Sequence, residues 1–365
     1  MESAAFAVRE YLARKGWIDP AAAVDVVPLS GGVSNDVWKI KGDGFCWVMK
    51  KALPKLRVSV DWYSDVGRIE REQEAMSALE PLLAPGTVPR IVHRDPEEHA
   101  YVMICAPDGA ECWKDRMMAG RMEIETAAAA GRLLRRMHDA TRARKDELRP
   151  SFADLRFFDE LRIDPFHRFL SAKFPEISGA ISRLVDELTS GGECLVHGDY
   201  SPKNILVLPD AAAGERSRAV SGVHTPGGGT PGSGTPGGEG STGAPGDGGS
   251  GTRLILLDYE VAHWGNPVFD QAYCCGHLML KGWTLGQERR AAEMIESFLR
   301  GYGGPCPGLV RHLGLMLLAR VDGKSTVSYI TDSALKEAIR SVGRRWVAGD
   351  EEDPSASVRE AFKLG

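Results

Sequence analysis

The chain has 365 residues, a length that suits two domains or one two-lobed domain with a substantial core. Its 45 basic and 50 acidic residues give a formal net charge of −5, which argues against a general binder of nucleic acid or anionic membranes. No apolar run approaches the roughly 20 residues that cross a bilayer. The N-terminal residues 1–17 read as a short amphipathic helix without the apolar centre of a signal peptide, so we expect a cytoplasmic protein.

The cysteines are odd in number and scattered, which is typical of a protein from a reducing compartment. Two of them are adjacent and lack the two-residue spacing of a zinc-binding pair. We therefore expect buried or half-buried thiols and no zinc site. The seven are Cys46, Cys105, Cys112, Cys194, Cys274, Cys275 and Cys306.

The order of the predicted elements divides the chain into a sheet region and a helical region. Short strand-like runs alternate over residues 25–106, interrupted by one helical stretch at 68–83. A small sheet followed by many helices predicts an α+β fold with two lobes, which we place at 1–106 and 107–365. The later helices are expected at 125–141, 176–190, 288–302, 308–321 and 333–346.

A glycine- and proline-rich segment interrupts the second region. Residues 221–251 contain 14 Gly and 4 Pro, with TPGGG, TPGSG and TPGGE in tandem. A segment with so little to bury predicts a disordered insertion, which we place at about 211–252. A partner-binding arm is the alternative interpretation.

The first polar motif is the turn LSGGVSNDVWKI, residues 29–40, between two strand-like runs. Its glycines permit close approach of the backbone to a ligand, and its Ser and Asn side chains add hydrogen-bond donors, which suits phosphates. The turn is neither a Walker A loop nor a GxGxxG motif, and a plain hairpin is the alternative. The candidate residues are Ser30, Gly31, Gly32, Ser34 and Asn35.

The next strand, FCWVMKKA, carries two lysines that alternation assigns to opposite faces. Lys50 shares a face with Cys46 and Val48, whereas Lys51 falls on the face of the aromatic residues. A lysine two positions after a small apolar residue suits a nucleotide, with Val48 against the base and Lys50 at the phosphates. We expect Lys51 to be solvated.

The helix at 68–83 places one carboxylate on its apolar face. At about 100° per residue, Glu72 falls within the stripe of Ile69, Met76 and Leu79. A carboxylate on a buried face costs energy unless a cation meets it, and Lys50 is the nearest candidate. A half-exposed glutamate without a partner is the alternative.

Two further motifs carry acidic residues and an amide. HGDYSPKNIL, residues 197–206, contains Asp199 and Asn204, and LILLDYE, residues 254–260, reads as a buried strand that ends at Asp258. Asn204 and Asp258 together offer oxygen ligands of the kind that hold magnesium. Asp199 then remains to accept a hydroxyl proton.

In this order, the motifs resemble those of the aminoglycoside phosphotransferase family of small-molecule kinases, which includes choline kinases and has a protein-kinase-like fold. The matching segments are LSGGVSNDVW, VMKKALPKLR with EREQEAM, HGDYSPKNIL, and LILLDYEVAHWGNPVFDQA, and they span residues 28–270. KKALPKLR and ELRIDPFHRF look closer to the methylthioribose-kinase-like, largely uncharacterised bacterial branch.

The resemblance implies a role for each motif residue. Asp199 resembles the catalytic base, Asn204 and Asp258 the Mg²⁺ ligands, and Lys50 the lysine that binds the α- and β-phosphates of ATP. Glu72 resembles the partner of that lysine, and His197 and Asp270 resemble the residues that brace the catalytic loop. The hinge that meets adenine corresponds to MICAP, where the backbones of Cys105 and Ala106 would bind.

These expectations describe an ATP- and Mg²⁺-dependent enzyme that phosphorylates a hydroxyl of an aminoglycoside, amino sugar or other sugar-containing compound. HGD and DYE in place of HRD and DFG, without an APE segment, disfavour a protein kinase. The alternatives are a metabolic kinase for methylthioribose, choline or homoserine, and a non-catalytic nucleotide-binding protein. Tyr273, His277 and Trp283 are candidate acceptor contacts, although their apolar neighbours favour a packing role for each of them.

Overall fold

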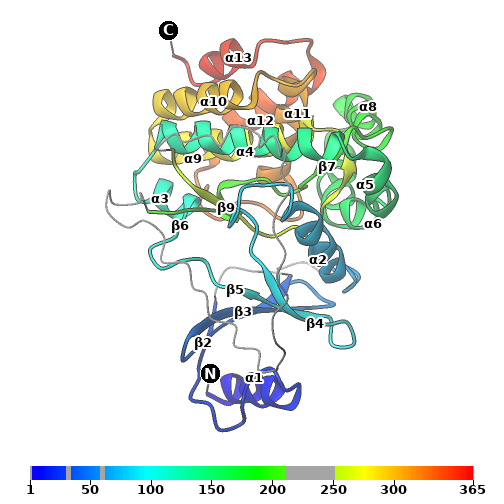
Figure 1. The fold of residues 1–365 in the computed structure, drawn as a ribbon. Helices are drawn as coiled ribbons and strands as arrows, with labels where there is room; N and C mark the ends of the chain where they lie inside the picture. The colour runs from blue at the N-terminus through cyan, green and yellow to red at the C-terminus, as the bar shows by residue number, and fades with distance from the viewer. Residues whose placement is uncertain (1, 30–33, 58–61, 210–250, 365) are drawn as a thin grey trace, which may run out of the picture.

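A computed structural model describes residues 2–29, 34–57, 62–209 and 251–364. The predicted turn residues Ser30, Gly31 and Gly32 lie outside these ranges, as does nearly all of the insertion predicted at about 211–252. A small sheet-based lobe lies beside a larger helical lobe (Figure 1). This is the two-lobed α+β architecture that the order of predicted elements indicated, and it agrees with the protein-kinase-like fold that the resemblance implied.

The smaller lobe is built on one antiparallel sheet with strand order β1–β2–β3–β5–β4. Short, alternating runs rich in Val, Ile, Trp and Tyr form its strands because such residues pack well on a pleated surface. The strands are β1 (Asp25–Pro28), β2 (Asn35–Gly42), β3 (Phe45–Ala52), β4 (Ile91–Asp95) and β5 (Ala100–Ile104).

The two faces of β3 pack against different partners, as its alternation predicted. Met49 is buried in a small apolar cluster that includes residues of helix α1 (Glu2–Arg14), which lies across the sheet (Figure 1). Val48 packs against the main core on the opposite face. Helix α2 (Arg68–Leu79) lies on the Val48 side, so Lys50 points toward α2 and the larger lobe.

The larger lobe is mostly helical, and the helices predicted from apolar periodicity all form within a few residues of their expected bounds. None of its described helices combines the length and apolar character that a membrane crossing requires. The helices are α3 (Trp113–Met118), α4 (Ile124–Arg142), α5 (Lys145–Phe152), α6 (Arg156–Phe158), α7 (Phe169–Lys173), α8 (Ser178–Thr189), α9 (Val268–Leu285), α10 (Glu288–Tyr302), α11 (Leu309–Asp322), α12 (Ser333–Ala348) and α13 (Pro354–Ala361). A π-helix covers Asp159–Arg168, and 3₁₀ turns cover Pro175–Ile177 and Pro202–Asn204.

Short strands at the base of the larger lobe set the positions of the motif residues. These strands are β6 (Glu111–Cys112), β7 (Cys194–Val196), β8 (Ile205–Val207), β9 (Leu254–Leu256) and β10 (His263–Gly265). β7 ends directly before His197, β8 starts directly after Asn204, and β9 ends two residues before Asp258. Because β8 pairs with β9, Asn204 and Asp258 leave neighbouring strands at the same edge.

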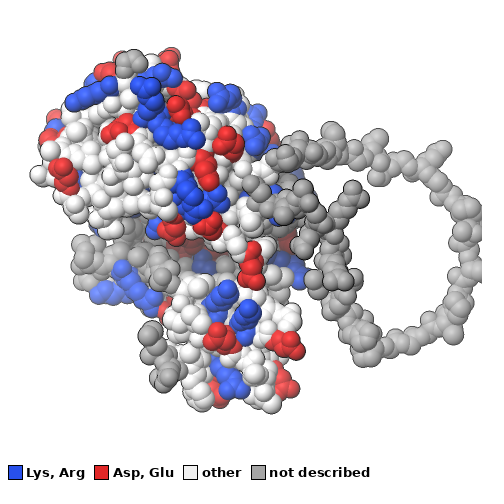
Figure 2. Space-filling view, turned by 90° about the vertical axis from the view of Figure 1, so that its left-hand side faces the viewer, with Lys and Arg blue, Asp and Glu red and all other residues white. Residues whose placement is uncertain are grey.

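The visible side of the molecule mixes charges of both signs. Figure 2 shows the larger lobe above a narrower smaller lobe, with described basic and acidic side chains interspersed on this face. The outer surface seen here therefore offers no broad field of one sign to attract a charged ligand.

Two glycines allow α4 and α10 to pack with their backbones in contact. A Cβ added at Gly131 of α4 would lie 2.0 Å from the carbonyl oxygen of Phe298 in α10. At Gly301 of α10, an added Cβ would lie 2.4 Å from the carbonyl oxygen of Ala128. The close crossing therefore requires residues without side chains at both positions.

We expect Gly131→Ala to lower the free energy of unfolding by about 1–3 kcal/mol, because the clash must be relieved by moving a backbone. The gain in helix propensity, about 1 kcal/mol at most, does not offset this. Urea denaturation would measure the difference. As a control, Gly179→Ala in α8 meets only the end of Arg183 at 3.9 Å and should be neutral or slightly stabilising. Equal effects at the two positions would contradict this account.

A histidine buried in β10 links stability to pH. The His263 ring stacks on Phe158 at 3.9 Å between ring centroids, and its Nδ1–H donates to the Val261 carbonyl oxygen at 2.9 Å. Burial lowers the pKa of His263 to about 4. In the unfolded chain the imidazole takes up a proton near pH 6.5, whereas in the folded protein it stays neutral until about pH 4.

The stability that neutral His263 contributes is therefore present above pH 6.5 and lost as the pH falls toward 4. Urea unfolding of His263→Asn at several pH values should show a slope in this window that is smaller by about 1.4 kcal/mol per pH unit. His167, whose pKa burial lowers to about 3, contributes equally in both proteins and leaves the comparison intact. Identical slopes would mean that His263 does not carry this dependence.

Candidate active site

The centre of the site is a lysine held between two carboxylates. The Nζ of Lys50 lies 2.7 Å from Oε1 of Glu72 in α2 and 2.9 Å from Oδ1 of Asp258 after β9. The predicted Lys50–Glu72 pair is thus confirmed, and the third member comes from the larger lobe. Lys51, by contrast, is half exposed and pairs with Glu98 at 2.6 Å, so its place on the outer face is also confirmed.

The charges in this cluster are distributed unevenly. Burial raises the pKa of Glu72 to about 7, although Lys50 opposes that shift. Burial also acts to raise the pKa of Asp258, but the positive charges of Lys50 and Lys203 outweigh it and hold that pKa far below its ordinary range. For Lys50, burial is outweighed by Asp258 and Glu72, so its pKa is raised and its ammonium stays charged.

Asp199 is buried with its two carboxylate oxygens in different surroundings. Oδ2 lies 2.8 Å from Nδ2 of Asn204, 2.9 Å from Nζ of Lys203 and 3.3 Å from a guanidinium nitrogen of Arg162. Oδ1 is buried and accepts no hydrogen bond from the described residues. Burial raises the pKa of Asp199, but Lys203 and Arg162 outweigh that effect and hold it below the ordinary range. One oxygen is therefore fixed by donors while the other is left open.

The loop around Asp199 is held by a fully buried aspartate at the start of α9. Asp270 accepts hydrogen bonds from the backbone N–H groups of His197 at 2.8 Å and Gly198 at 2.9 Å. It also lies 3.1 Å from Nε2 of His138. The His197 ring accepts from the Asp199 N–H through Nδ1 and meets the Leu257 carbonyl oxygen through Nε2 at 3.0 Å. His197 and Asp270 are both buried and hold the backbone of the Asp199 loop.

Gly198 permits this arrangement because it lies in the left-handed region, at φ +78°. A Cβ at this position would lie 2.7 Å from the carbonyl oxygen of Val261. The middle residue of HGD therefore has to be glycine for two independent reasons.

The described part of the glycine-rich turn is tied to the larger lobe by a glutamate. Ser34 Oγ donates to Oε1 of Glu260 at 2.8 Å, and Asn35 Nδ2 donates to Oε2 at 3.1 Å. The buried guanidinium of Arg68 lies 3.3 Å from the same carboxylate and also binds the carbonyl oxygens of Ser34 and Leu53. The side chains of Ser34 and Asn35, expected to be free for phosphates, are engaged with Glu260 in this structure.

After β5, the backbone N–H of Cys105 is not available for adenine, contrary to the sequence-based prediction. The N–H of Cys105 donates to the carbonyl oxygen of Cys46 at 2.9 Å and continues the β3–β5 ladder, so it is not free for an adenine ring. The backbone N–H and carbonyl oxygen of Ala106, the next residue, form no hydrogen bond with the described residues.

Cys105 is also joined to Cys46 by a disulfide. The expectation that all cysteines are thiols was therefore wrong for this pair. Because β3 and β5 are neighbours, the two Cα atoms lie 5.3 Å apart, well within disulfide reach, although 59 residues separate them in the chain. The other five cysteines are free, as predicted.

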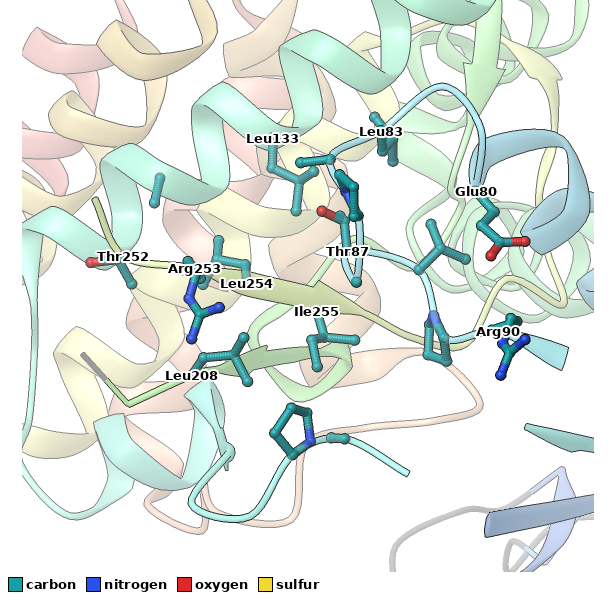
Figure 3. Close-up of a pocket in the computed structure, with 18 of the residues that line it drawn as sticks. Glu80, Leu83, Thr87, Arg90, Leu133, Leu208, Thr252, Arg253, Leu254 and Ile255 are labelled. Carbon is teal, nitrogen blue, oxygen red and sulfur yellow. The ribbon is translucent and has the colours of Figure 1, made fainter. Parts of the chain in front are cut away.

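A cavity of the described structure lies outside the cluster of Lys50, Glu72 and Asp258. It measures about 580 Å³ and lies between the loop after α2, the segment Ile104–Pro107, α4 and the β8–β9 pair. Figure 3 shows Leu133 of α4, Leu208 after β8 and Ile255 of β9 around it. Lys50, Asp199, Asn204 and Asp258 do not line it, whereas Cys105 and Ala106 do.

Sequence analysis missed four residues that hold the site together, namely Arg68, Arg162, Lys203 and Glu260. Two of them lie within the motifs and could have been predicted from the sequence. Lys203 lies four residues after Asp199 in the same loop, and Glu260 lies two residues after Asp258. Arg162 comes from the π-helix, and nothing in its local sequence indicates a position beside Asp199.

Comparison with known proteins identifies the family. The family model for the APH group, described as the phosphotransferase enzyme family, matches residues 25–220, more than half of the chain. No curated protein matches the sequence. Among solved structures, the choline kinase LicA from Streptococcus pneumoniae is similar at 13% identity, covering 98% of this chain and 97% of that one, with a TM-score of 0.46.

A macrolide 2′-phosphotransferase, MphH from Brachybacterium faecium, is similar at 16% identity, covering 95% of this chain and 99% of that one, with a TM-score of 0.44. Likenesses this distant do not indicate what the present chain phosphorylates. The family match extends from β1 through the Asp199 loop and so includes both Lys50 and Asp199. This chain belongs to the phosphotransferase enzyme family and is an enzyme of the small-molecule kinase class.

Proposed function

We propose that the enzyme transfers the γ-phosphate of ATP, with Mg²⁺, to a hydroxyl group of a small molecule. The observation that carries this proposal is the Asp199 carboxylate, with one oxygen fixed by three donors and the other buried and open. An acceptor hydroxyl at Oδ1 would donate its proton there. Its oxygen would form a bond to the γ-phosphorus while the bond to the β-phosphate oxygen breaks, and ADP would leave.

The charged cluster supports binding of the nucleotide phosphates near Asp199. Lys50 is kept protonated between Glu72 and Asp258, so a phosphate would meet a cation whose position is already fixed. Val48, two residues earlier on the same face of β3, would pack against the base. The backbone groups of Ala106 and the carbonyl of Cys105 would face the adenine edge, whereas the N–H of Cys105 is excluded because Cys46 occupies it.

The residues present also fit a magnesium ion. Asp258 is an ionised carboxylate at the edge of the site, and the nitrogen of the Asn204 amide faces Asp199, which leaves its oxygen for a cation. Hard oxygen donors of this kind suit Mg²⁺, which takes its remaining ligands from water and phosphates. The ion, when bound, would neutralise charge on the transferred phosphate. A cage of three or more acidic, His or Cys side chains is absent from the described residues, and a site of this type does not need one.

The lobes that the sequence suggested at 1–106 and 107–365 fit this proposal. β3 and α2 supply Lys50 and Glu72 from the first segment, and Asp199, Asn204 and Asp258 come from the second. ATP would then bind where the two segments meet. A non-catalytic nucleotide-binding protein is disfavoured because this set of charged residues is complete.

Asp199→Ala is the first test. We expect ADP release to fall by roughly 100- to 10,000-fold, because general-base catalysis is lost, while ATP binding measured by calorimetry is largely retained. The assay would offer aminoglycosides, simple sugars, methylthioribose, choline and homoserine. Asp146→Ala, the same change at an exposed aspartate of α5, serves as control. Full turnover by the Asp199 variant would reject the assigned role.

Glu260→Gln tests how the glycine-rich turn is positioned. The carboxamide can keep one hydrogen bond to Ser34 or Asn35 but loses the charge that faces Arg68. Since charge-assisted hydrogen bonds contribute about 1.5–3 kcal/mol, we expect the KM for ATP to rise by about tenfold, with a smaller change in kcat. Glu98→Gln, at an exposed ion pair with Lys51, should leave both constants nearly unchanged. A fall in kcat at constant KM would contradict a role in nucleotide binding.

A further inference from the structure

A buried lysine near the catalytic loop lacks an acidic partner. Lys281 of α9 is only 1% exposed, and its Nζ donates to the carbonyl oxygen of His277, one turn earlier, at 3.3 Å. No carboxylate of the described residues lies within ion-pair distance, and the nearest π-face is that of Tyr329 at 5.4 Å. Burial, with the nearby charges of Lys114 and Arg320, lowers the pKa of Lys281 to about 7. A cation in such surroundings is costly unless an anion joins it.

Three further polar atoms beside Lys281 are buried without hydrogen-bond partners among the described residues. They are Nε2 of His277, the hydroxyl of Tyr329 and Nε of Arg320. Burial lowers the pKa of His277 well below its ordinary value, and each charged neighbour that adds to this shift is a cation. Those neighbours are Lys281, Arg320, Lys203 and Arg162.

A chain of side-chain contacts connects these residues to Asp199. Arg162 lies 3.3 Å from Asp199, and its guanidinium lies over the Tyr273 ring at 5.5 Å. The Tyr273 ring in turn meets His277 at 5.1 Å, and His277 precedes Lys281 by one turn of α9. We call Arg162, His277, Lys281, Arg320 and Tyr329 the Lys281 cluster.

Two acidic residues of the site, Asp258 and Glu260, are already engaged elsewhere. Asp258 faces Lys50, and Glu260 faces Ser34, Asn35 and Arg68. A cationic acceptor, such as an amino sugar or choline, would therefore meet positive charge on the side of Asp199 where the Lys281 cluster lies. An anionic group there would satisfy the open donors and compensate the buried ammonium.

We propose that the Lys281 cluster binds a carboxylate or phosphate group of the alcohol that Asp199 deprotonates, so that the acceptor is an acidic alcohol. The proposal rests on the proposed function for the place of the reacting hydroxyl. The anion site itself rests on the contacts of the described residues. Acceptor selection would then follow from charge inside the site, since the face seen in Figure 2 has no dominant sign.

Matched ligand pairs test the anion site in the full-length enzyme. D-glycerate and glycerol, gluconate and glucitol, and glucose 6-phosphate and glucose share a skeleton and differ in charge. We expect at least one anion to raise the Tm while its neutral counterpart does not. Comparing the two carboxylates with the sugar phosphate shows which of the two anionic groups the site binds. A shift with neutral members only, with kanamycin or choline only, or with none of these compounds at millimolar concentration overturns the proposal.

Lys281→Met separates recognition from folding. Methionine fills similar space without charge, so the Tm without ligand should stay or rise, whereas the shift caused by the anion should be lost. For an anionic substrate, KM should increase about tenfold with an unchanged KM for ATP. Lys145→Met, at an exposed position of α5, should retain the shift. An unchanged anion-induced shift in Lys281→Met contradicts the proposal.

Asp199→Ala distinguishes the two hypotheses. It should keep the anion-induced shift and lose turnover. Anion binding to an enzyme that never releases ADP would reject the proposed function and leave the anion site standing. Turnover of neutral or cationic alcohols alone would support the proposed function and reject the anion site.

Discussion

The ion pair of Lys50 with both Glu72 and Asp258 is the interaction on which the site depends. It joins a strand of the sheet, the helix beside it and the segment after β9, at 2.7 and 2.9 Å. The three side chains are largely removed from water, so losing Lys50 would leave two carboxylates without their cation. This requirement fixes the smaller lobe against the larger one where the phosphates would bind. Burial raises the pKa of Glu72 against the pull of Lys50, whereas Lys50 and Lys203 together lower the pKa of Asp258 despite its burial.

A second buried acid, Asp270, holds the loop that carries Asp199. Asp270 takes two backbone N–H groups from HGD and the ring of His138, so the loop that carries Asp199 is held from below by the start of α9. The same helix carries Tyr273, His277 and Lys281. One helix thus connects the position of the proposed base with the proposed recognition of the acceptor. A change in α9 that shifts Asp270 would alter both together.

Charge is separated across the site. Acidic groups gather around Lys50, where the nucleotide and its metal would bind, and cations gather beyond Asp199. In the proposed function, the side with Lys50 would offer oxygen ligands to a cation, and the side beyond Asp199 would offer donors to an anion. Asp199 lies between them, and its pKa is kept low by Lys203 and Arg162. These cations keep the carboxylate ionised, and its Oδ1 atom, which has no described hydrogen-bond partner, is where the proposed acceptor hydroxyl would donate.

The sequence by itself determined the elements and the motif residues. Apolar periodicity placed Glu72 on the buried face of its helix, and alternation placed Lys50 on the opposite face of β3 from Lys51, because both patterns depend only on near neighbours in the chain. The roles of Asp199, Asn204 and Asp258 followed from motif order and remain proposals. Tertiary structure decided what depends on distant segments meeting. The Ser34–Glu260 bond spans 226 residues, the disulfide joins Cys46 to Cys105, and Arg162 reaches Asp199 from a π-helix. That no described carboxylate lies beside Lys281 also depends on distant segments, because the neighbours of a buried side chain come from several parts of the chain.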